Sequence, residues 1–250
     1  MRTCVRTLRI LEALSSGEKL SVSELGRMLG LHKSTVYRFL ETLCREGYVV
    51  QDPHDEKYRL SLKILRLGHN LLSNLDYRNV ARPYLEQLAA QTGETAYLAV
   101  LDEGQVLYLD RVSLTDKLQT MCKIGDRNFV HCTALGKAQI AYLPEEKVEQ
   151  IISMWGMPAL TSHTITDLGV LKERLAEVRK LGYAVDDVEA EDDVRCVAAP
   201  IRDYTGNVVA AVSVSGPSSR VTLERIHLEL AKAVAHTARQ ISLELGYIDS

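Results

Sequence analysis

Residues 21–47, SVSELGRMLGLHKSTVYRFLETLCREG, carry the pattern of two helices joined by a tight turn. Ser21 and Glu24 form a capping box, in which each side chain can accept a hydrogen bond from a free backbone amide at a helix start. Gly30 lies about two turns later, where a helix end favours the left-handed conformation that glycine adopts without a steric clash. The stretch therefore predicts a first helix that ends near Leu29, followed by a turn.

A second helix follows from Lys33, with one apolar side and one polar side. At 100° per residue, the residues on its apolar side are Val36, Phe39, Leu40, Leu43 and Cys44. Its first turns carry hydroxyls, an aromatic ring and a cation. These groups suit the major groove of DNA, because Arg can read guanine and hydroxyls can reach bases or phosphates. The residues of this helix that we expect to contact DNA are Lys33, Ser34, Thr35, Tyr37 and Arg38.

A hairpin directly behind this helix favours a DNA-binding module over two ordinary surface helices. Residues 48–51 form a β-prone run, and residues 58–60 can return as a second strand after the turn cluster at 52–55. Lys57 and Arg59 lie on or near this predicted wing, where they can contact phosphate.

An upstream helix completes the module. An apolar residue recurs every three positions, at Val5, Leu8, Leu11 and Leu14. This repeat predicts a helix that packs behind the other two. We therefore expect a winged helix-turn-helix DNA-binding domain over residues 1–61, a linker helix over 62–75 and a second domain over 76–250.

The net charge of −3 is unevenly divided along the chain. Residues 1–66 hold 12 Lys and Arg against 8 Asp and Glu, a net charge of +4, whereas the remainder holds 18 against 25, a net charge of −7. The basic excess lies where the DNA-binding motif lies. Because this excess is small, we expect affinity to depend on well-placed contacts and on dimerisation more than on a broad basic field.

The composition is typical of a soluble globular protein, which we expect to stay in the cytoplasm. At 250 residues the chain is long enough for two domains. No apolar stretch approaches the length that crosses a bilayer, and the N-terminus lacks a signal-peptide pattern. The five cysteines are odd in number and show no paired spacing, which favours a reducing compartment over a disulfide framework.

The second domain orders its helices and strands as an antiparallel α+β sheet would require. The strands that we predict are residues 95–101, 105–112, 118–124, 195–201 and 208–215. The helices that we predict are residues 76–93, 133–142, 144–154, 167–181 and 221–245. Turns at 102–104 and 203–207 each join two neighbouring strands into a hairpin.

Several polar residues fall where such a sheet can hold a small ligand. Thr133 begins the TALGKA helix, whose free amides and dipole favour a carboxylate or phosphate. Ser213 and Ser215 are two apart on one strand and so point to the same face. Asp186 and Cys196 bracket the loop before the neighbouring strand. The alternative is structural, with buried and hydrogen-bonded serines, a Thr133 that is only a helix cap, and a Cys196 that belongs to the core.

Metal and nucleotide chemistry fit the sequence less well. Zinc sites usually contain C-x-x-C or H-x-E groupings, which are lacking around the four candidate ligands Cys122, His131, Cys132 and Cys196. Gly136-Lys137 resembles part of a phosphate loop, but that loop requires Gly where position 131 is His, and Ser or Thr where position 138 is Ala. We therefore expect no metal, no cofactor and no NTPase activity.

Two further classes of function remain open as alternatives. One is an enzyme domain fused to the DNA-binding module, with Cys196 or His131 as a catalytic group. No G-x-S-x-G motif accompanies the serines, which disfavours a hydrolase. The other is an architectural DNA protein that binds no ligand.

Four motifs resemble the IclR family of bacterial transcription regulators: LGLHKSTVYRFLETL, HCTALGKA, GYAVDDVEAEDDVRCVAAPI and VSVSGP. The resemblance covers nearly the whole chain. It implies an N-terminal winged helix, a linker helix and a C-terminal GAF-like effector domain, assembled as a homodimer or homotetramer on palindromic, double-stranded operator DNA. Carried over by motif, the implied effector pocket includes Ala134, Leu135, Asp186, Cys196, Ser213 and Ser215.

Within the family, three runs look most like the KdgR subgroup, which regulates 2-keto-3-deoxygluconate catabolism: KSTVYRFL, IGDRN followed by TALGK, and ARQISLELGYID. This likeness implies a keto sugar acid as the effector, for which a helix start and two hydroxyls suit the carboxylate and its neighbouring oxygens. We expect repression that the ligand relieves. The alternatives are another small organic or aromatic acid, and activation by the same parts.

Overall fold

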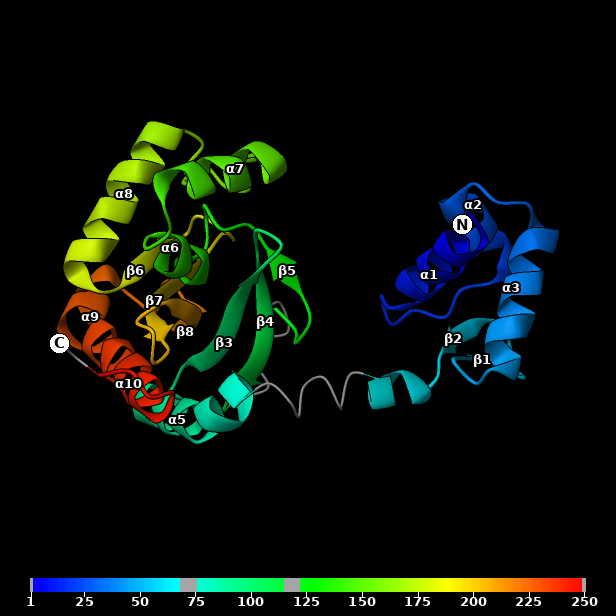
Figure 1. The fold of residues 1–250 in the computed structure, drawn as a ribbon. Helices are drawn as coiled ribbons and strands as arrows, with labels where there is room; N and C mark the ends of the chain where they lie inside the picture. Colours follow the sequence, from blue (N-terminus) through cyan, green and yellow to red (C-terminus); the bar gives the residue numbers. More distant parts are fainter. Residues whose placement is uncertain (1, 68–75, 115–121, 249–250) are drawn as a thin grey trace. The chain divides into compact units, whose positions relative to one another are not determined.

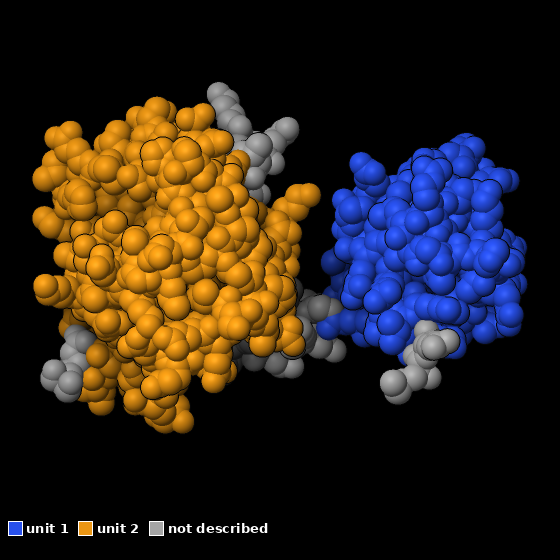
Figure 2. All heavy atoms as spheres, turned by 90° about the horizontal axis from the view of Figure 1, so that it is seen from above, with its two compact units in different colours: residues 1–74 blue, residues 75–250 orange. Residues whose placement is uncertain are grey.

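The computed structural model describes residues 2–67, 76–114 and 122–248, which form two compact units. One unit spans Met1–Asn74 and the other spans Leu75–Ser250 (Figure 2). Among the described residues, no helix is both long and apolar enough to cross a membrane.

The first unit is a winged helix-turn-helix, as predicted (Figure 1). The antiparallel strands β1 and β2 form the wing. The elements are α1 (Arg2–Leu14), α2 (Val22–Leu29), α3 (Lys33–Arg45), β1 (Val49–Gln51) and β2 (Tyr58–Leu60).

The predicted start and end of α2 are confirmed in atomic detail. The Ser21 hydroxyl accepts a hydrogen bond from the Glu24 amide at 3.3 Å, and the Glu24 carboxylate accepts one from the Ser21 amide at 2.7 Å. Gly30 follows the helix with φ 64° and ψ 35°, the left-handed conformation. These local interactions fix the turn between α2 and α3, and with it the direction in which α3 begins.

The helix α1 differs from its prediction in the face that it buries. Ile10 and Leu14 are buried, whereas Val5 and Leu8 are 47% and 58% exposed. A repeat of three rotates by 60° at every step around a helix, so four such residues spread over half of its surface. The pair four residues apart, Ile10 and Leu14, stays on one face and packs on the core of α2 and α3.

The predicted linker helix over 62–75 lies mainly outside the described residues. Residues 63–67 are helical, and Leu62 is in a turn. Residues 68–75 are not described, and the linker helix stays a prediction there.

The second unit is a three-layer α+β domain, as predicted (Figure 1). Its antiparallel sheet has the strand order β5-β4-β3-β8-β7-β6. The strands are β3 (Thr95–Asp102), β4 (Gln105–Val112), β5 (Arg127–Asn128), β6 (Ala184–Asp187), β7 (Val194–Arg202) and β8 (Val208–Pro217). The helices are α5 (Asp76–Thr92), α6 (Ala134–Ile140), α7 (Glu145–Trp155), α8 (Leu168–Leu181), α9 (Leu223–Arg225), the π-helix η1 (Ile226–Leu230) and α10 (Ala231–Glu244).

Alternation along the strands assigns each side chain to one of two cores. On β8, Val212 and Val214 pack with α5 and α10, whereas Ala211 faces the core of α6, α7 and α8. On β3, Leu98 packs in the core with α5 and α10, whereas Tyr97 faces the core of α6, α7 and α8. Because successive strand residues point to opposite faces, Ser213 and Ser215 share the α6 face with Ala211, as predicted.

Four elements differ from the sequence-based expectation. The strands β5 and β6 are short and were not predicted, and the predicted helix over 221–245 contains the π-helical segment η1. Most of the predicted strand 118–124 lies outside the described residues, and residues 122–124 are not in a strand.

The helix α6 is buried along its whole length, and two of its contacts are unusual. Gly136 lies against the backbone of Val130, where an added Cβ would come within 2.4 Å of the Val130 Cα. Lys137 is fully buried, and its ammonium forms an ion pair and hydrogen bonds with the Glu189 carboxylate. Gly136 therefore allows close packing, and Lys137 forms an ion pair that connects α6 to the loop after β6.

We expect Lys137→Met to lower the free energy of unfolding of the second unit by about 3–5 kcal/mol, because Glu189 would stay buried without its partner. Urea unfolding followed by the fluorescence of Trp155, the single tryptophan of the chain, measures this change. The double variant Lys137→Met, Glu189→Leu should recover much of the loss. The control Lys172→Met removes a more exposed lysine and should change stability little. Equal effects of both lysine variants would contradict the buried-pair interpretation.

Candidate functional site

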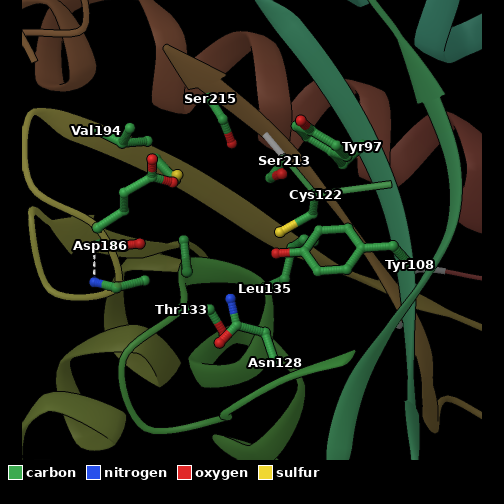
Figure 3. A pocket seen from close by; sticks show the side chains of 14 residues that line it. Tyr97, Tyr108, Cys122, Asn128, Thr133, Leu135, Asp186, Val194, Ser213 and Ser215 are labelled. Atoms are coloured by element: carbon green, nitrogen blue, oxygen red, sulfur yellow. Dashed lines mark hydrogen bonds between the residues drawn. The ribbon is translucent and has the colours of Figure 1, made fainter. Parts of the chain in front are cut away.

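A cavity of about 60 Å³ lies between the sheet and α6 (Figure 3). All seven residues predicted for the effector site line it: Thr133, Ala134, Leu135, Asp186, Cys196, Ser213 and Ser215. The sequence patterns thus converge on one place in the fold.

The register of the sheet brings these residues together. Cys196 on β7 lies opposite Asp186 on β6 and opposite Ser215 on β8. Ser213 lies opposite Tyr97 on β3. Residues directly opposite on antiparallel strands share a face, with their Cβ atoms about 5 Å apart. Two polar rows therefore run across the sheet on the side that α6 covers.

Thr133 caps α6, and its hydroxyl is fully engaged. The hydroxyl donates to the Phe129 carbonyl at 2.8 Å and accepts from the Gly136 amide at 3.1 Å. No acceptor within the described residues takes the amides of Ala134 and Leu135. The structural interpretation of Thr133 as a cap is therefore correct, and the donors free for a ligand at this helix start are these two amides.

Asp186 is a buried carboxyl group in the cavity lining. It is almost fully buried and accepts hydrogen bonds from the Glu189 and Ala190 amides at 2.7 and 3.4 Å. Burial raises its pKa to about 7, against the opposing effect of the positive charge of Lys137. Burial also raises the pKa of the Cys196 thiol well above its ordinary value, so Cys196 stays protonated and is a poor nucleophile.

The lining of the cavity is acidic. Asp186 and Glu191 contribute carboxyl groups, and no Lys, Arg or His is among its described lining residues. Burial raises the pKa of Glu191 as well. An anionic ligand here would depend on backbone amides and hydroxyls for its hydrogen bonds.

The loop after β6 is held in a strained conformation. Val188 has φ 61°, a region that β-branched residues rarely adopt. Its carbonyl accepts from the Thr161 hydroxyl at 2.7 Å, and the Glu189 carbonyl accepts from the Thr164 hydroxyl at 2.6 Å. Together with the Lys137 ion pair, these bonds fix the acidic wall of the cavity.

The candidate zinc ligands do not converge. Within residues 2–67, 76–114 and 122–248, no group of three or more His, Cys, Asp or Glu side chains could hold a metal ion. His131 is buried, its Nε2 lies 3.2 Å from the Pro158 carbonyl oxygen, and burial lowers its pKa. Cys122 and Cys196 line the cavity, whereas His131 and Cys132 are not among its lining residues.

Sequence reasoning missed half of the cavity lining. The additional lining residues are Tyr97, Tyr108, Cys122, Asn128, Ala190, Glu191 and Val194. Tyr97 and Tyr108 lie on predicted strands, and each is directly next to a buried apolar residue, which gave no reason to separate them from the core. Only the alternation of β3 relative to Ser213 could have pointed to Tyr97.

The predicted DNA-contacting residues lie on the exposed side of α3 and on the wing. Lys33, Ser34, Tyr37 and Arg38 are exposed, and Thr35 is half-buried. Arg59 is exposed, whereas the Lys57 ammonium lies 3.5 Å from the Glu24 carboxylate. Among the described residues, none pairs with Lys33 or Arg38 in a salt bridge. The first turns of α3 thus present cations and hydroxyls that the unit does not use internally.

Comparisons with known proteins agree on both units. A model of the IclR helix-turn-helix domain matches residues 3–53, and a model of the bacterial transcriptional regulator IclR C-terminal domain matches residues 69–243. The HTH-type transcriptional regulator KdgR of Dickeya chrysanthemi is 37% identical over 98% of this chain and 80% of its own. The HTH-type transcriptional repressor AllR of Escherichia coli K12 is 34% identical over 96% of this chain and 89% of its own.

A solved structure extends the likeness to the whole fold. An IclR homolog from Microbacterium hydrocarbonoxydans, complexed with 4-hydroxybenzoate, is 27% identical and has a TM-score of 0.85, with 97% of this chain and 98% of that chain covered. The curated relatives are named as transcriptional regulators, which sets aside the alternative of an enzyme domain fused to a DNA-binding module. The chain belongs to the IclR family of bacterial transcriptional regulators.

Proposed function

We propose that this protein is a repressor that binds a palindromic operator through α3 and the wing, and that a small carboxylate bound between the sheet and α6 releases it. The observation that carries the proposal is the convergence of the seven predicted effector residues on one cavity, in a unit separate from the DNA-binding unit. The repressor named among the relatives supports the sign of regulation. A DNA-bound regulator acts in the cytoplasm.

A keto sugar acid, and 2-keto-3-deoxygluconate in particular, is the effector that we propose. The likeness to KdgR supports this class, and the free amides of Ala134 and Leu135 suit a carboxylate. The hydroxyls of Ser213 and Ser215 suit the oxygens of a sugar chain. The alternative is an aromatic acid, because the relative from Microbacterium hydrocarbonoxydans is complexed with 4-hydroxybenzoate.

The mechanism that we propose is a ligand-dependent change between two states of a homodimer or homotetramer. Two copies of α3 would contact successive major grooves of a palindrome, as in other helix-turn-helix dimers. The ligand can weaken DNA binding only if it binds more tightly to the state that does not fit the operator. Residues 62–75 connect the two units and are the part of the chain through which we propose the change passes.

Thermal unfolding against a panel of small acids tests the proposal. The panel contains 2-keto-3-deoxygluconate, pyruvate, glyoxylate and 4-hydroxybenzoate. A saturable rise of the melting temperature with 2-keto-3-deoxygluconate alone supports the proposed effector. A rise only with 4-hydroxybenzoate favours the aromatic alternative, and no rise with any acid contradicts the proposed sensor chemistry.

We expect Arg38→Ala to weaken binding to a specific operator by about 1–3 kcal/mol, because Arg in the first turns of a recognition helix reads base edges. The operator is selected from random duplexes with the wild-type protein, and affinity is measured by fluorescence anisotropy at fixed salt. Arg45→Ala, in the last turn of the same helix, is the matched control and should have a smaller effect. If Arg38→Ala weakens binding to the selected and to random duplexes equally, Arg38 contacts only phosphate.

We expect the affinity for an anionic effector to fall as the pH rises through about 7, because Asp186 then becomes negatively charged inside the cavity. The limit of the effect is about tenfold per pH unit above the pKa. Titration calorimetry between pH 6 and 8.5 measures it, and Asp186→Asn should flatten the profile. Asp203→Asn, in an exposed turn, is the control. An equal pH dependence in both variants would show that Asp186 is not the responsible group.

The same pKa has a consequence for stability. The folded protein keeps the Asp186 proton between the ordinary carboxyl pKa, near 4, and about 7, whereas the unfolded chain loses it in that range. Asp186 therefore lowers the free energy of unfolding as the pH rises across this window, and its contribution is constant above it. Asp186→Asn should remove this slope.

A further inference from the structure

Two buried hydroxyls face the cavity without a partner in the protein. Tyr97 is 2% exposed and Ser213 is fully buried. Neither hydroxyl has a hydrogen-bond partner among the described residues. The two residues lie directly opposite each other on β3 and β8, and both line the cavity. Figure 3 shows the Tyr97 hydroxyl directed toward the side of the cavity on which the Ser213 and Ser215 hydroxyls lie.

Unpartnered hydroxyls in such a position require a physical explanation. Buried polar groups are nearly always hydrogen-bonded, because an unmade bond costs the full desolvation of the group. The hydroxyl of Tyr108, on the neighbouring strand, is not among these unpartnered atoms, and Figure 3 shows it beside the Cys122 side chain. The rings of Tyr97 and Tyr108 pack edge to face, with centroids 5.4 Å apart. The Tyr97 ring is thus packed against the protein, while its hydroxyl has no partner among the described residues.

We infer that Tyr97 is a specificity-determining residue, which together with Ser213 binds an uncharged hydroxyl or carbonyl oxygen of the effector at the end remote from its carboxylate. The inference rests on the proposed effector function of this cavity. On this inference, the side of the cavity formed by Tyr97 and Ser213 on the sheet binds the chain of the ligand. The side formed by the amides of Ala134 and Leu135 on α6 binds its carboxylate. The ligand class that it selects is an acid with an oxygenated chain.

The chemistry of the two walls supports this division. The free amides of Ala134 and Leu135 are donors only, which suits a carboxylate. A hydroxyl is both a donor and an acceptor, so the pair formed by Tyr97 and Ser213 can bind an alcohol as well as a carbonyl. Burial raises the pKa of the Tyr97 hydroxyl, which keeps it a neutral donor.

The length of the ligand follows from the same division. A short acid that reaches only the α6 amides leaves the Tyr97 hydroxyl unpaired, whereas a chain with a distal hydroxyl satisfies both walls. Sites that hydrogen-bond a ligand hydroxyl discriminate strongly against analogues that lack it, because the protein groups are then left without partners. The cavity should therefore separate acids by their chain oxygens more than by their carboxylates.

Titration calorimetry with two matched ligands tests the inference on the full-length protein. The ligands are 2-keto-3-deoxygluconate and 2-oxohexanoate, which has the same carbon skeleton and 2-oxo acid group but no hydroxyls. We expect the wild-type protein to bind 2-keto-3-deoxygluconate more tightly. Tyr97→Phe should weaken that binding about tenfold and leave the affinity for 2-oxohexanoate unchanged. In combination with Ser213→Ala, the two losses should be less than additive, because both hydroxyls contact the same ligand oxygen.

Two controls separate recognition from structure. Tyr183→Phe removes a hydroxyl that lies 3.2 Å from His227 Nδ1, outside the cavity lining, and should not change either affinity. Tyr97→Phe should leave the melting temperature of the protein alone unchanged or higher, because it removes a buried hydroxyl that has no protein partner. A lower melting temperature would show that the hydroxyl has a structural partner and would overturn the inference.

The binding outcomes distinguish the inference from the proposed function. If Tyr97→Phe weakens both ligands equally, Tyr97 binds the carboxylate or the 2-oxo group, and the inference is wrong while the effector site stands. If Tyr97→Phe weakens neither ligand, the inference is wrong as well. If the wild-type protein binds neither ligand, the proposed keto sugar acid function fails first and the inference fails with it.

Discussion

The ion pair between Lys137 and Glu189 is the constraint on which the cavity depends. Two charges removed from water are tolerated only when they meet each other with good geometry, so the positions of α6 and of the loop after β6 are coupled. The helix α6 presents free amides to the cavity, the loop after β6 presents Glu191, and Asp186 lies in β6 just before that loop. Because Glu189 already neutralises Lys137, the nearby Asp186 lacks a full counter-charge, and its pKa rises with burial.

Local signals were sufficient to predict the helix-turn-helix and much of the cavity. The capping box at Ser21 and Glu24 and the left-handed Gly30 act within one or two turns of chain, and the structure confirms them. Strand alternation places Ser213 and Ser215 on one face without knowledge of any neighbour. Asp186 and Cys196 were predicted near the ligand from their positions on either side of a loop and from the family resemblance, whereas their direct pairing on β6 and β7 is known only from the structure.

What the sequence could not predict depends on pairings between distant segments. Tyr97 and Ser213 are opposite each other only because β3 pairs with β8, and no local pattern specifies that register. Lys137 follows Gly136 and so resembled part of a phosphate loop. Its partner, Glu189, is 52 residues away in sequence, so no local pattern could identify the ion pair. The face that α1 buries was predicted only in part: Leu11 and Leu14 pack on the core, whereas Val5 and Leu8 are exposed. A three-residue repeat does not follow the helical period of 3.6, so the packing partners decide between the candidates.

The cavity therefore combines a wall that is fixed by internal bonds with a wall that keeps hydrogen-bonding capacity for a ligand. The side chains of Thr133, Asp186 and Glu189 form hydrogen bonds within the protein. The hydroxyls of Tyr97 and Ser213 have no hydrogen-bond partner among the described residues. A ligand that satisfies these hydroxyls stabilises the conformation in which they face the cavity, by an amount set by its affinity for that conformation. If that conformation disfavours operator binding, thermodynamic linkage requires the operator to lower ligand affinity by the same factor. The chemistry that selects the ligand and the free energy available for regulation would then have a common origin in the unpaired hydroxyls of the sheet.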